Sequence, residues 1–205
     1  LQPVDLFSDE HRGEAFTRLN PSQAVPVLEH DGFVLTEASA ILKYLAELTV
    51  SPAYPADLRS RARVNEMMDW FNTFLMRDFV YGVVYARVLS HYRLPEPGFT
   101  QALQIHEPRA LKRFRALDAR IGAQPFVCGD AISLADYFGA AIVTAGDLID
   151  FDLRQWPNVS RWIASMKARP AWEEVNAAFH GWRSAVATQA RLDPSANTAG
   201  TRITA

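Results

Sequence analysis

Residues 20–45 read NPSQAVPVLEHDGFVLTEASAILKYL, a run in which two extended segments are followed by a helix. The segment 25–28 has the short apolar character of a strand, and the Asp-Gly pair at 31–32 is a strong hairpin turn signal. Residues 33–35 then return antiparallel. Apolar side chains recur at helical spacing from 40 to 48, which gives that helix one apolar face. The stretch therefore predicts an α/β layer, with a hairpin that leads directly into a helix.

The flanking residues extend this α/β region toward the N-terminus. Residues 4–6 have the pattern of a short strand end, and Ser8 offers a cap for a helix that extends to residue 19. Pro21 ends that helix, because proline disfavours the helical conformation of its predecessor. Residues 1–50 are therefore expected to form one small α/β domain, although a strand at its start needs a neighbouring strand.

Everything after residue 56 has helical character. Residues 51–55 read SPAYP, and two prolines in five residues favour an extended linker over 51–56. Helical patterns then follow over 57–90, 101–121, from 133 onward, over 159–168 and over 171–179. Strands first and then only helices indicate two domains, the second all-α and covering 57–190. The segment 191–205 is rich in Pro, Ser, Thr, Ala and Gly, and we expect a flexible tail there.

Composition excludes several classes of protein. The 205 residues carry a net charge of −2 from 21 basic and 23 acidic side chains, so no concentrated basic face for nucleic acid is expected. No apolar run reaches the roughly 18 residues of a membrane span, and we find no zinc-spaced cluster or phosphate-binding glycine loop. Cys128 is the only cysteine, which fits a reducing, cytoplasmic location.

Two features of the α/β region suggest a ligand site. Pro26 opens a strand although proline cannot donate to a sheet ladder, and the simplest reading is a trans proline at a sheet edge. Glu37 begins a helix, where an acidic residue commonly serves the helix dipole. The alternative for both is that they bind a ligand, because a glutamate can pair with an ammonium group and free N–H groups at a helix start suit a carboxylate.

The spacing of these features resembles the glutathione transferase family, in particular its theta-type branch and bacterial members. The resemblance rests on Asn20-Pro21-x-x-x-Val25-Pro26-Val27-Leu28 and on the helix start at Glu37-Ala38. It implies a thioredoxin-like glutathione-binding domain with a cis Val25–Pro26 bond, joined to an all-α helical bundle. The backbone of Val25 would then face the tripeptide, and Glu37 with the Ala38 N–H would hold its γ-glutamyl end. The family usually has serine where this chain has Ala38, a loss of about 1 kcal/mol of binding.

The resemblance extends to the other end of the tripeptide. Residues Val4 to Pro21 are similar to the theta-type branch of the family. This similarity implies that His11 lies near the glycine carboxylate of glutathione, to which an imidazole can donate. The alternative is a solvated histidine at an exposed helix start. Relatives often carry glycine and a long polar residue where this chain has Gln23 and Ala24, so Gln23 is the compensating candidate.

The helical domain contains one structural motif. Ser133 and Asp136 have the spacing of a capping box, with aspartate in the reciprocal role. The resemblance implies that this element is buried and structural, and loss of the Ser133 cap is expected to cost about 1 kcal/mol or more.

A helix rich in aromatic residues and methionine is the candidate wall of a second site. Packing in the core or at an interface is the favoured interpretation of residues 67–76. The resemblance implies that the same helix also lines a pocket for a hydrophobic co-substrate, with candidates Phe74, Phe79, Tyr81 and Tyr85. Cys128 lies among apolar residues, so an inert buried thiol is expected there.

The reaction that the resemblance implies is conjugation by a homodimer. Glutathione is the co-substrate, and its thiolate attacks a hydrophobic electrophile. The Ser, Tyr or Cys that stabilises the sulfur follows the first strand in this family. That first strand and helix have no counterpart here, so we expect the residue upstream of Leu1 in a longer natural product. A non-catalytic binder of glutathione or apolar ligands is the alternative, with reductive or isomerase chemistry as a third possibility.

Overall fold

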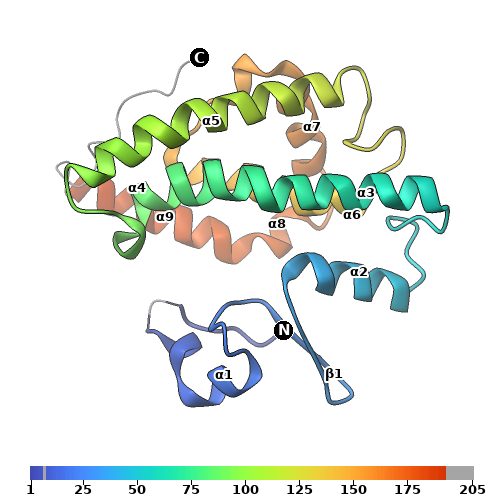
Figure 1. Ribbon diagram of the computed structural model, residues 1–205, viewed down its shortest axis with the longest axis horizontal. Coiled ribbons are helices and arrows are strands. Elements are labelled where there is room, and N and C mark those ends of the chain that lie inside the picture. Colours follow the sequence, from blue (N-terminus) through green and yellow to red (C-terminus); the bar gives the residue numbers. More distant parts are fainter. Residues whose placement is uncertain (7, 193–205) are drawn as a thin grey trace. The chain divides into compact units, whose positions relative to one another are not determined.

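The computed structural model describes residues 1–6 and 8–192 (Figure 1). It separates into two compact units, which are described in turn. The first is Leu1–Ala56, and the second starts at Asp57.

The first unit is a small α/β layer. Its elements in chain order are η1 (Glu10–Arg12), α1 (Glu14–Leu19), β1 (Val27–His30), β2 (Phe33–Thr36) and α2 (Ala38–Leu48). Strands β1 and β2 form an antiparallel hairpin in which His30 pairs with Phe33. The two turn residues, Asp31 and Gly32, have φ of 50° and 79°, as a two-residue turn that matches the strand twist requires. The predicted hairpin and the helix that follows it are confirmed.

The strand expected at residues 4–6 is wrong. The described residues of this unit form a two-stranded sheet of β1 and β2 only, so this segment lacks a neighbour to complete its hydrogen bonds. A turn replaces it: Glu10 accepts from the Asp5 N–H at 2.7 Å, and the Ser8 N–H donates to the Asp5 carboxylate at 3.3 Å. An extended segment without a partner strand is thus replaced by local polar contacts.

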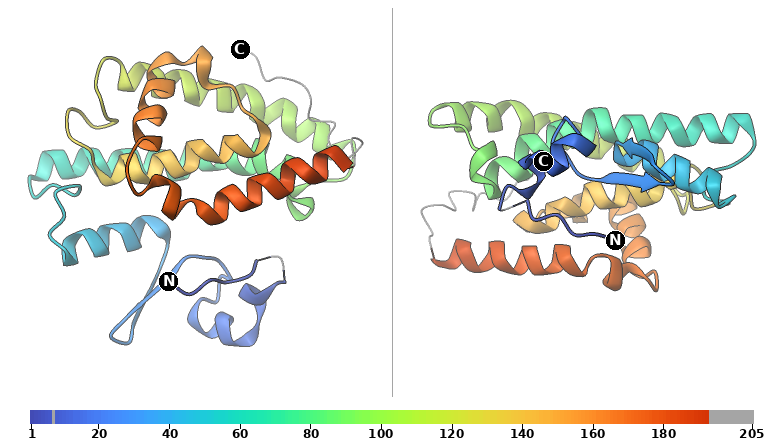
Figure 2. Two further views of the ribbon diagram at one scale, coloured as in Figure 1. Left: turned by 180° about the vertical axis from the view of Figure 1, so that it is seen from behind. Right: turned by 90° about the horizontal axis from the view of Figure 1, so that it is seen from below.

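The second unit is built from helices. Its elements are α3 (Leu58–Trp70), η2 (Phe71–Tyr85), α4 (Ala86–Val88), η3 (Ser90–Tyr92), α5 (Gly98–Ile121), α6 (Leu134–Thr144), η4 (Ala145–Ile149), η5 (Leu153–Gln155), α7 (Pro157–Lys167), α8 (Trp172–Val175) and α9 (Ala177–Leu192). The single helix expected over 57–90 is one continuous rod of α3, η2 and α4, lying alongside α5 (Figures 1 and 2). Its middle part, η2, is wound as a π-helix. This rare winding closes hydrogen bonds from residue i to i+5.

Aromatic side chains fill the core of the helical unit. Phe79 of η2 meets Phe114 of α5 edge-on at 4.8 Å between ring centroids, and Phe114 stacks on Trp156 at the same separation. At the start of η2, Phe71 stacks on Trp162 of α7. All of these rings are buried, so η2, α5 and α7 are held by shared apolar surface.

The end of the helical unit differs from the expected pattern. The last helix was expected to stop at residue 179, but α9 continues to Leu192. Phe179 and Trp182 form a half-buried stripe on it, and the Arg183 guanidinium donates to the Asp147 carbonyl at 3.0 Å. These contacts stabilise α9, whose other residues are mostly small or polar. The expected flexible tail, 191–205, therefore begins inside α9, and residues 193–205 lie outside the described part of the chain.

Within the described ranges, 1–6 and 8–192, no helix has the length and apolar character needed to cross a membrane.

Candidate functional site

The hairpin brings the predicted glutathione-binding residues of the first unit to one end. The Val25–Pro26 peptide bond is cis, as expected. Val27 pairs with Thr36, so Pro26 and Glu37 are the next residues along the two paired strands. Val25 is 41% exposed beside them. The register therefore places Val25, Pro26 and Glu37 at the same edge of the hairpin, although ten residues separate the proline from the glutamate in the chain.

Asn20 shapes the loop that leads into this edge. Its side chain is buried, its Nδ2 donates to the Ala24 carbonyl at 2.7 Å, and its Oδ1 accepts from the Ser22 N–H at 3.0 Å. The Gln23 N–H donates to the Asn20 carbonyl, which closes the turn. One side chain thus satisfies the backbone groups of a loop that has little apolar packing.

Glu37 has an unusual backbone. Its φ of 69° with ψ of 112° is a sparsely populated combination for a residue with a side chain, and the side chain is exposed. No side chain caps α2, and Ile41 is the first residue whose N–H reaches a backbone partner, the Glu37 carbonyl. In the described chain the N–H groups of the first turn, starting at Ala38, have no protein partner. An exposed carboxylate and free helix donors thus lie together.

Gln23 and His11 are the two residues expected at the glycine end of glutathione, and each has its own surroundings in the first unit. Gln23 has a positive φ of 54°, and its Nε2 donates to the Thr17 hydroxyl at 3.1 Å, so its carboxamide turns back to α1. His11 lies in η1, with a buried Nδ1 that has no hydrogen-bond partner among the described residues. Among residues 1–6 and 8–192, no hydrogen bond or ion pair joins His11 to Val25 or Glu37.

The second unit carries a cluster of tyrosines. Tyr81 and Tyr85 of η2 and Tyr92 of η3 have ring centroids 5.4 to 5.6 Å apart, and Tyr85 also approaches Trp182 of α9. Burial raises the pKa of the Tyr85 hydroxyl, and the neighbouring hydroxyls of Tyr81 and Tyr92 raise it further. Tyr81 is 44% exposed. The cluster is therefore an apolar, partly open wall.

The other two candidates for the co-substrate pocket are not part of this cluster. Phe79 is fully buried between Phe114 and Phe151, so it does not line any surface of the unit, contrary to the expectation. Phe74 is half-buried, and its ring lies under the guanidinium of Arg113 at 4.4 Å. The sequence pattern of η2 could not separate these faces, because π-winding changes which positions share one side of the helix.

The predicted capping box is present at the start of α6. Asp136 is fully buried, and its carboxylate accepts from the N–H and hydroxyl of Ser133, from the Val127 N–H and from the Trp162 indole, at 2.8 to 3.0 Å. The motif therefore joins three segments of the helical core.

Cys128 does not have the surroundings of a nucleophile. Burial raises the pKa of its thiol, which outweighs the effect of the Ser133 hydrogen bond. No cluster of three or more potential metal ligands occurs among the described residues.

These features define a class of protein. A small α/β unit with a cis proline beside a helix N-terminus, followed by an all-helical unit with a buried capping box, is a thioredoxin-like domain joined to a helical bundle. The domain family "Glutathione S-transferase, N-terminal domain" matches residues 2–47, and "Glutathione S-transferase, C-terminal domain" matches residues 84–170. The chain belongs to the glutathione S-transferase family.

Individual relatives agree with this assignment. The chain is 31% identical over 179 residues to glutathione S-transferase D7 of Drosophila melanogaster, covering 83% of this chain and 74% of the relative. It is 35% identical over 139 residues to human glutathione S-transferase theta-1, which is 66% of this chain and 58% of that protein. Among solved structures, a delta-class glutathione transferase of Nilaparvata lugens has 27% identity and a TM-score of 0.77, over 91% of this chain and 86% of that one.

Proposed function

We propose that this protein binds glutathione at the hairpin edge of its first unit and transfers the glutathione thiolate to a hydrophobic electrophile. The observation that carries the proposal is the register of the hairpin, which sets Val25 and Pro26 beside Glu37 and the free end of α2. The family assignment supports glutathione as the co-substrate.

Charge explains how this edge would hold the tripeptide. The γ-glutamyl group of glutathione carries one ammonium and one carboxylate. The exposed Glu37 carboxylate pairs with the ammonium of the ligand. The free N–H of Ala38 donates to the carboxylate of the γ-glutamyl group, which the positive end of the helix dipole also favours. The backbone of Val25, an exposed residue, then hydrogen-bonds the peptide part, as a strand edge does with an extended peptide.

The tyrosine cluster supports an apolar acceptor substrate. Tyr81, Tyr85 and Tyr92 offer stacking surface with few charges, which suits an aromatic or alkyl electrophile. The protein would contribute binding and orientation of the two reactants, with stabilisation of the thiolate. We do not assign the stabilisation of the glutathione sulfur to any of the 205 residues.

A non-catalytic binder of glutathione or of apolar ligands is the second candidate. Ala38 lacks the hydroxyl that the family usually places there, and the Gln23 carboxamide is engaged with Thr17. Both observations predict weaker anchoring of glutathione. This candidate needs the same hairpin edge, so binding and turnover must be measured separately.

Glu37→Gln tests the binding site. Removing the charge that pairs with the ammonium is expected to weaken glutathione binding by about tenfold or more, since a hydrogen bond to a charged group contributes roughly 1.5–3 kcal/mol. Isothermal titration calorimetry with glutathione measures this. Glu29→Gln is the matched control, because Glu29 is an exposed glutamate on β1 of the same hairpin. Equal affinities for wild type and Glu37→Gln would contradict the site.

Turnover then separates enzyme from binder. Thiol consumption is followed with 1-chloro-2,4-dinitrobenzene and with an alkyl halide, at saturating and at subsaturating glutathione. The enzyme proposal expects consumption that Glu37→Gln lowers at subsaturating glutathione. Glutathione binding without consumption of any electrophile would favour the non-catalytic member.

Three finer features complete the proposal. The match to human theta-1 over 139 residues supports a theta-like class, whereas the match to the delta-class structure supports the delta class. The match to D7 does not decide between them, so we propose only that the protein belongs to the group that contains both classes. We further propose a homodimer, to be tested by native mass spectrometry, and a cytoplasmic location, to be tested by fractionation.

A further inference from the structure

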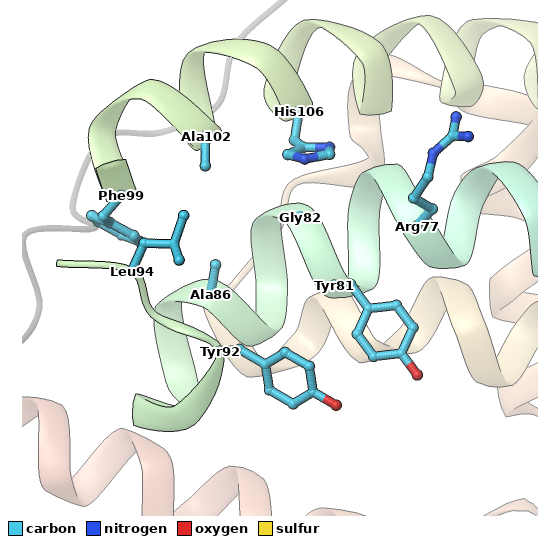
Figure 3. A pocket seen from close by; sticks show the side chains of 9 residues that line it. All are labelled: Arg77, Tyr81, Gly82, Ala86, Tyr92, Leu94, Phe99, Ala102 and His106. Carbon is cyan, nitrogen blue, oxygen red and sulfur yellow. The ribbon is translucent and has the colours of Figure 1, made fainter. Parts of the chain in front are cut away.

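Helix α5 has one face inside the helical unit and one face outside it. Phe99, Ala102 and His106 point from α5 toward the rod that contains η2, as Figure 3 shows. Phe114 and Leu117 continue this inner face and are buried. Figure 1 shows α5 along one edge of the helical unit. The opposite face of α5 is therefore its solvent side.

Three basic side chains lie on this outer face. Arg109, Lys112 and Arg115 are exposed, and their spacing of three residues puts them on successive turns of the helix. None of the three has an ion pair or a side-chain hydrogen bond within the described ranges, 1–6 and 8–192. Residues 109–120 include only one acid, Asp118, which accepts from two backbone N–H groups at the start of α7. We call the three exposed residues the α5 basic face.

The ion pairs between η2 and α5 add to this positive charge. Asp78 is fully buried, and its Oδ1 accepts from Arg77 Nε at 2.8 Å. Its Oδ2 accepts from Arg113 Nε at 3.1 Å. One carboxylate is thus shared by two guanidinium groups, which leaves one positive charge over. The Arg77 side chain is 52% exposed, so this charge reaches the surface beside α5.

The C-terminal end of α5 shows the same imbalance. Glu66 of α3 pairs with both Arg63 and Arg120, again two guanidinium groups for one carboxylate. Arg161 of α7 donates to two backbone carbonyls just beyond the end of α5, at 2.7 and 3.0 Å. Backbone carbonyls are neutral, so these bonds leave the charge of Arg161 in place. Both flanks of α5 are therefore positive.

This charge is unevenly distributed over the chain. The net charge of the protein is −2, and its composition predicted no concentrated basic face. Folding gathers the cations, because α5 packs against both η2 and α7. Such an asymmetry orients a molecule toward a surface of opposite charge. Since the surplus comes from several neighbouring segments and not from one line of residues, it suits a broad anionic surface better than a single acidic chain.

We propose that the outer face of α5 binds an anionic lipid bilayer, with Arg109, Lys112 and Arg115 at the lipid headgroups. Ile105 is 50% exposed one turn before Arg109, and it adds an apolar contact at the same face. The association would be peripheral and reversible. It goes beyond the proposed function, because no residue of this surface is assigned to glutathione or to its acceptor.

Vesicles that differ in headgroup charge test the proposal. The full chain is sedimented with vesicles of phosphatidylcholine alone, and with vesicles in which about one third of the lipid is phosphatidylserine. Each basic residue near an anionic leaflet strengthens binding by about fivefold, so the α5 basic face should favour the anionic vesicles by about a hundredfold. The preference should disappear in about 1 M salt, where the screening length is about 3 Å.

Substitutions on α5 locate the binding. The triple variant Arg109→Gln/Lys112→Gln/Arg115→Gln should partition into anionic vesicles about a hundredfold less than wild type, and Lys112→Gln alone about fivefold less. The variant Arg109→Lys/Arg115→Lys keeps the charges, so it should bind as wild type does. This rescue separates the charge of the side chains from any effect of their shape on the helix.

A matched control removes the same charge elsewhere. Arg12→Gln/Arg18→Gln/Arg59→Gln changes three exposed arginines outside α5. It should stay within about twofold of wild type, because exposed charges beyond a screening length contribute little. Circular dichroism establishes that each variant is folded, and Lys112→Gln keeps the test valid if the triple variant on α5 does not fold.

Three results would overturn the proposal. The first is equal partitioning of wild type into the two kinds of vesicle. The second is an equal loss of binding in the α5 triple variant and in the matched control. The third is binding of a polyglutamate peptide or a DNA duplex through the α5 basic face without binding to the anionic vesicles, which would assign the face to an acidic macromolecule instead.

Discussion

The two units of this protein bury very different side chains. In the described part of the first unit, the buried residues are Asn20, Ile41, Ala46 and Ala53, none of them aromatic. The second unit buries large rings completely, among them Phe71, Phe114 and Trp162. A two-stranded hairpin is marginal in water by itself, whereas a helical core with many buried rings is not. The unit that carries the proposed glutathione contacts is therefore the one with the smaller stability of its own, which is common for binding regions.

The largest effect is expected from breaking the core of the helical unit. Asp136→Ala would leave four buried donors without an acceptor, including the Trp162 indole. We expect a loss of about 3–5 kcal/mol in the free energy of unfolding. Urea denaturation followed by tryptophan fluorescence measures it. The exposed Asp130 provides the control, with Asp130→Ala within about 0.5 kcal/mol of wild type. Similar losses in both variants would show that the capping box is not a central connection.

A smaller effect is expected where η2 is tied to α5. Burial raises the pKa of the Asp78 carboxyl, but hydrogen bonds from Arg77 and Arg113 outweigh this and hold the pKa below its usual value. Asp78→Asn should cost about 2 kcal/mol at pH 7. A carboxyl with a lowered folded-state pKa stabilises the protein above its unfolded pKa, near 3.9, and loses that contribution as the pH falls through the folded value.

The pH dependence checks the origin of that loss. Urea midpoints of wild type and Asp78→Asn should differ by a constant amount between pH 7 and about pH 5, and should converge below about pH 4. A gap that stays constant down to pH 3 would mean that shape, and not charge, is responsible.

In the first unit, a buried polar side chain should affect binding more than global unfolding. Asn20→Ala removes the bonds to Ala24 and Ser22 that shape the loop before Pro26. We expect a local loss of about 1–2 kcal/mol. It should appear as faster hydrogen exchange in β1 and β2 and as weaker glutathione binding, with an unchanged urea midpoint for the helical unit. A lowered midpoint for the helical unit would contradict the comparison.

The smallest expected effect is a gain. Ala38→Ser restores a hydroxyl at the first residue of α2, next to the free N–H groups. A net gain of about 1 kcal/mol would tighten glutathione binding by about fivefold. Calorimetry measures the gain, and Ala40→Ser, one residue beyond Ser39 on the same helix, is the control. Unchanged affinity in Ala38→Ser would place the γ-glutamyl carboxylate elsewhere.

Local signals in the sequence predicted the parts of the fold that local physics determines. The Asp31-Gly32 turn and the Ser133–Asp136 capping box each depend on neighbours a few residues away. The cis bond before Pro26 followed from the family resemblance and not from the local sequence, which favoured a trans proline. The strand expected at residues 4–6 failed because a strand requires a partner, which no local pattern supplies.

Contacts between distant residues were beyond the sequence. Asp78 lies 28 positions before His106 and 35 positions before Arg113 in the chain. The three side chains meet only because η2 packs against α5. The burial of Phe79 beside the exposure of Tyr81 was missed for a different reason. A periodicity of 3.6 residues assumes α-winding, and η2 does not have it.

The winding of η2 also bears on how the chain tolerates changes in length. A π-turn spans one residue more than an α-turn, so η2 carries surplus residues for the distance it covers. Deleting one residue from an α-helix rotates everything beyond it by about 100°. In η2 the same deletion can be absorbed when one wide turn tightens to an ordinary one, with both ends of the rod left facing as before. A single-residue deletion can thus be absorbed in the middle of this rod, where an ordinary helix tolerates it least.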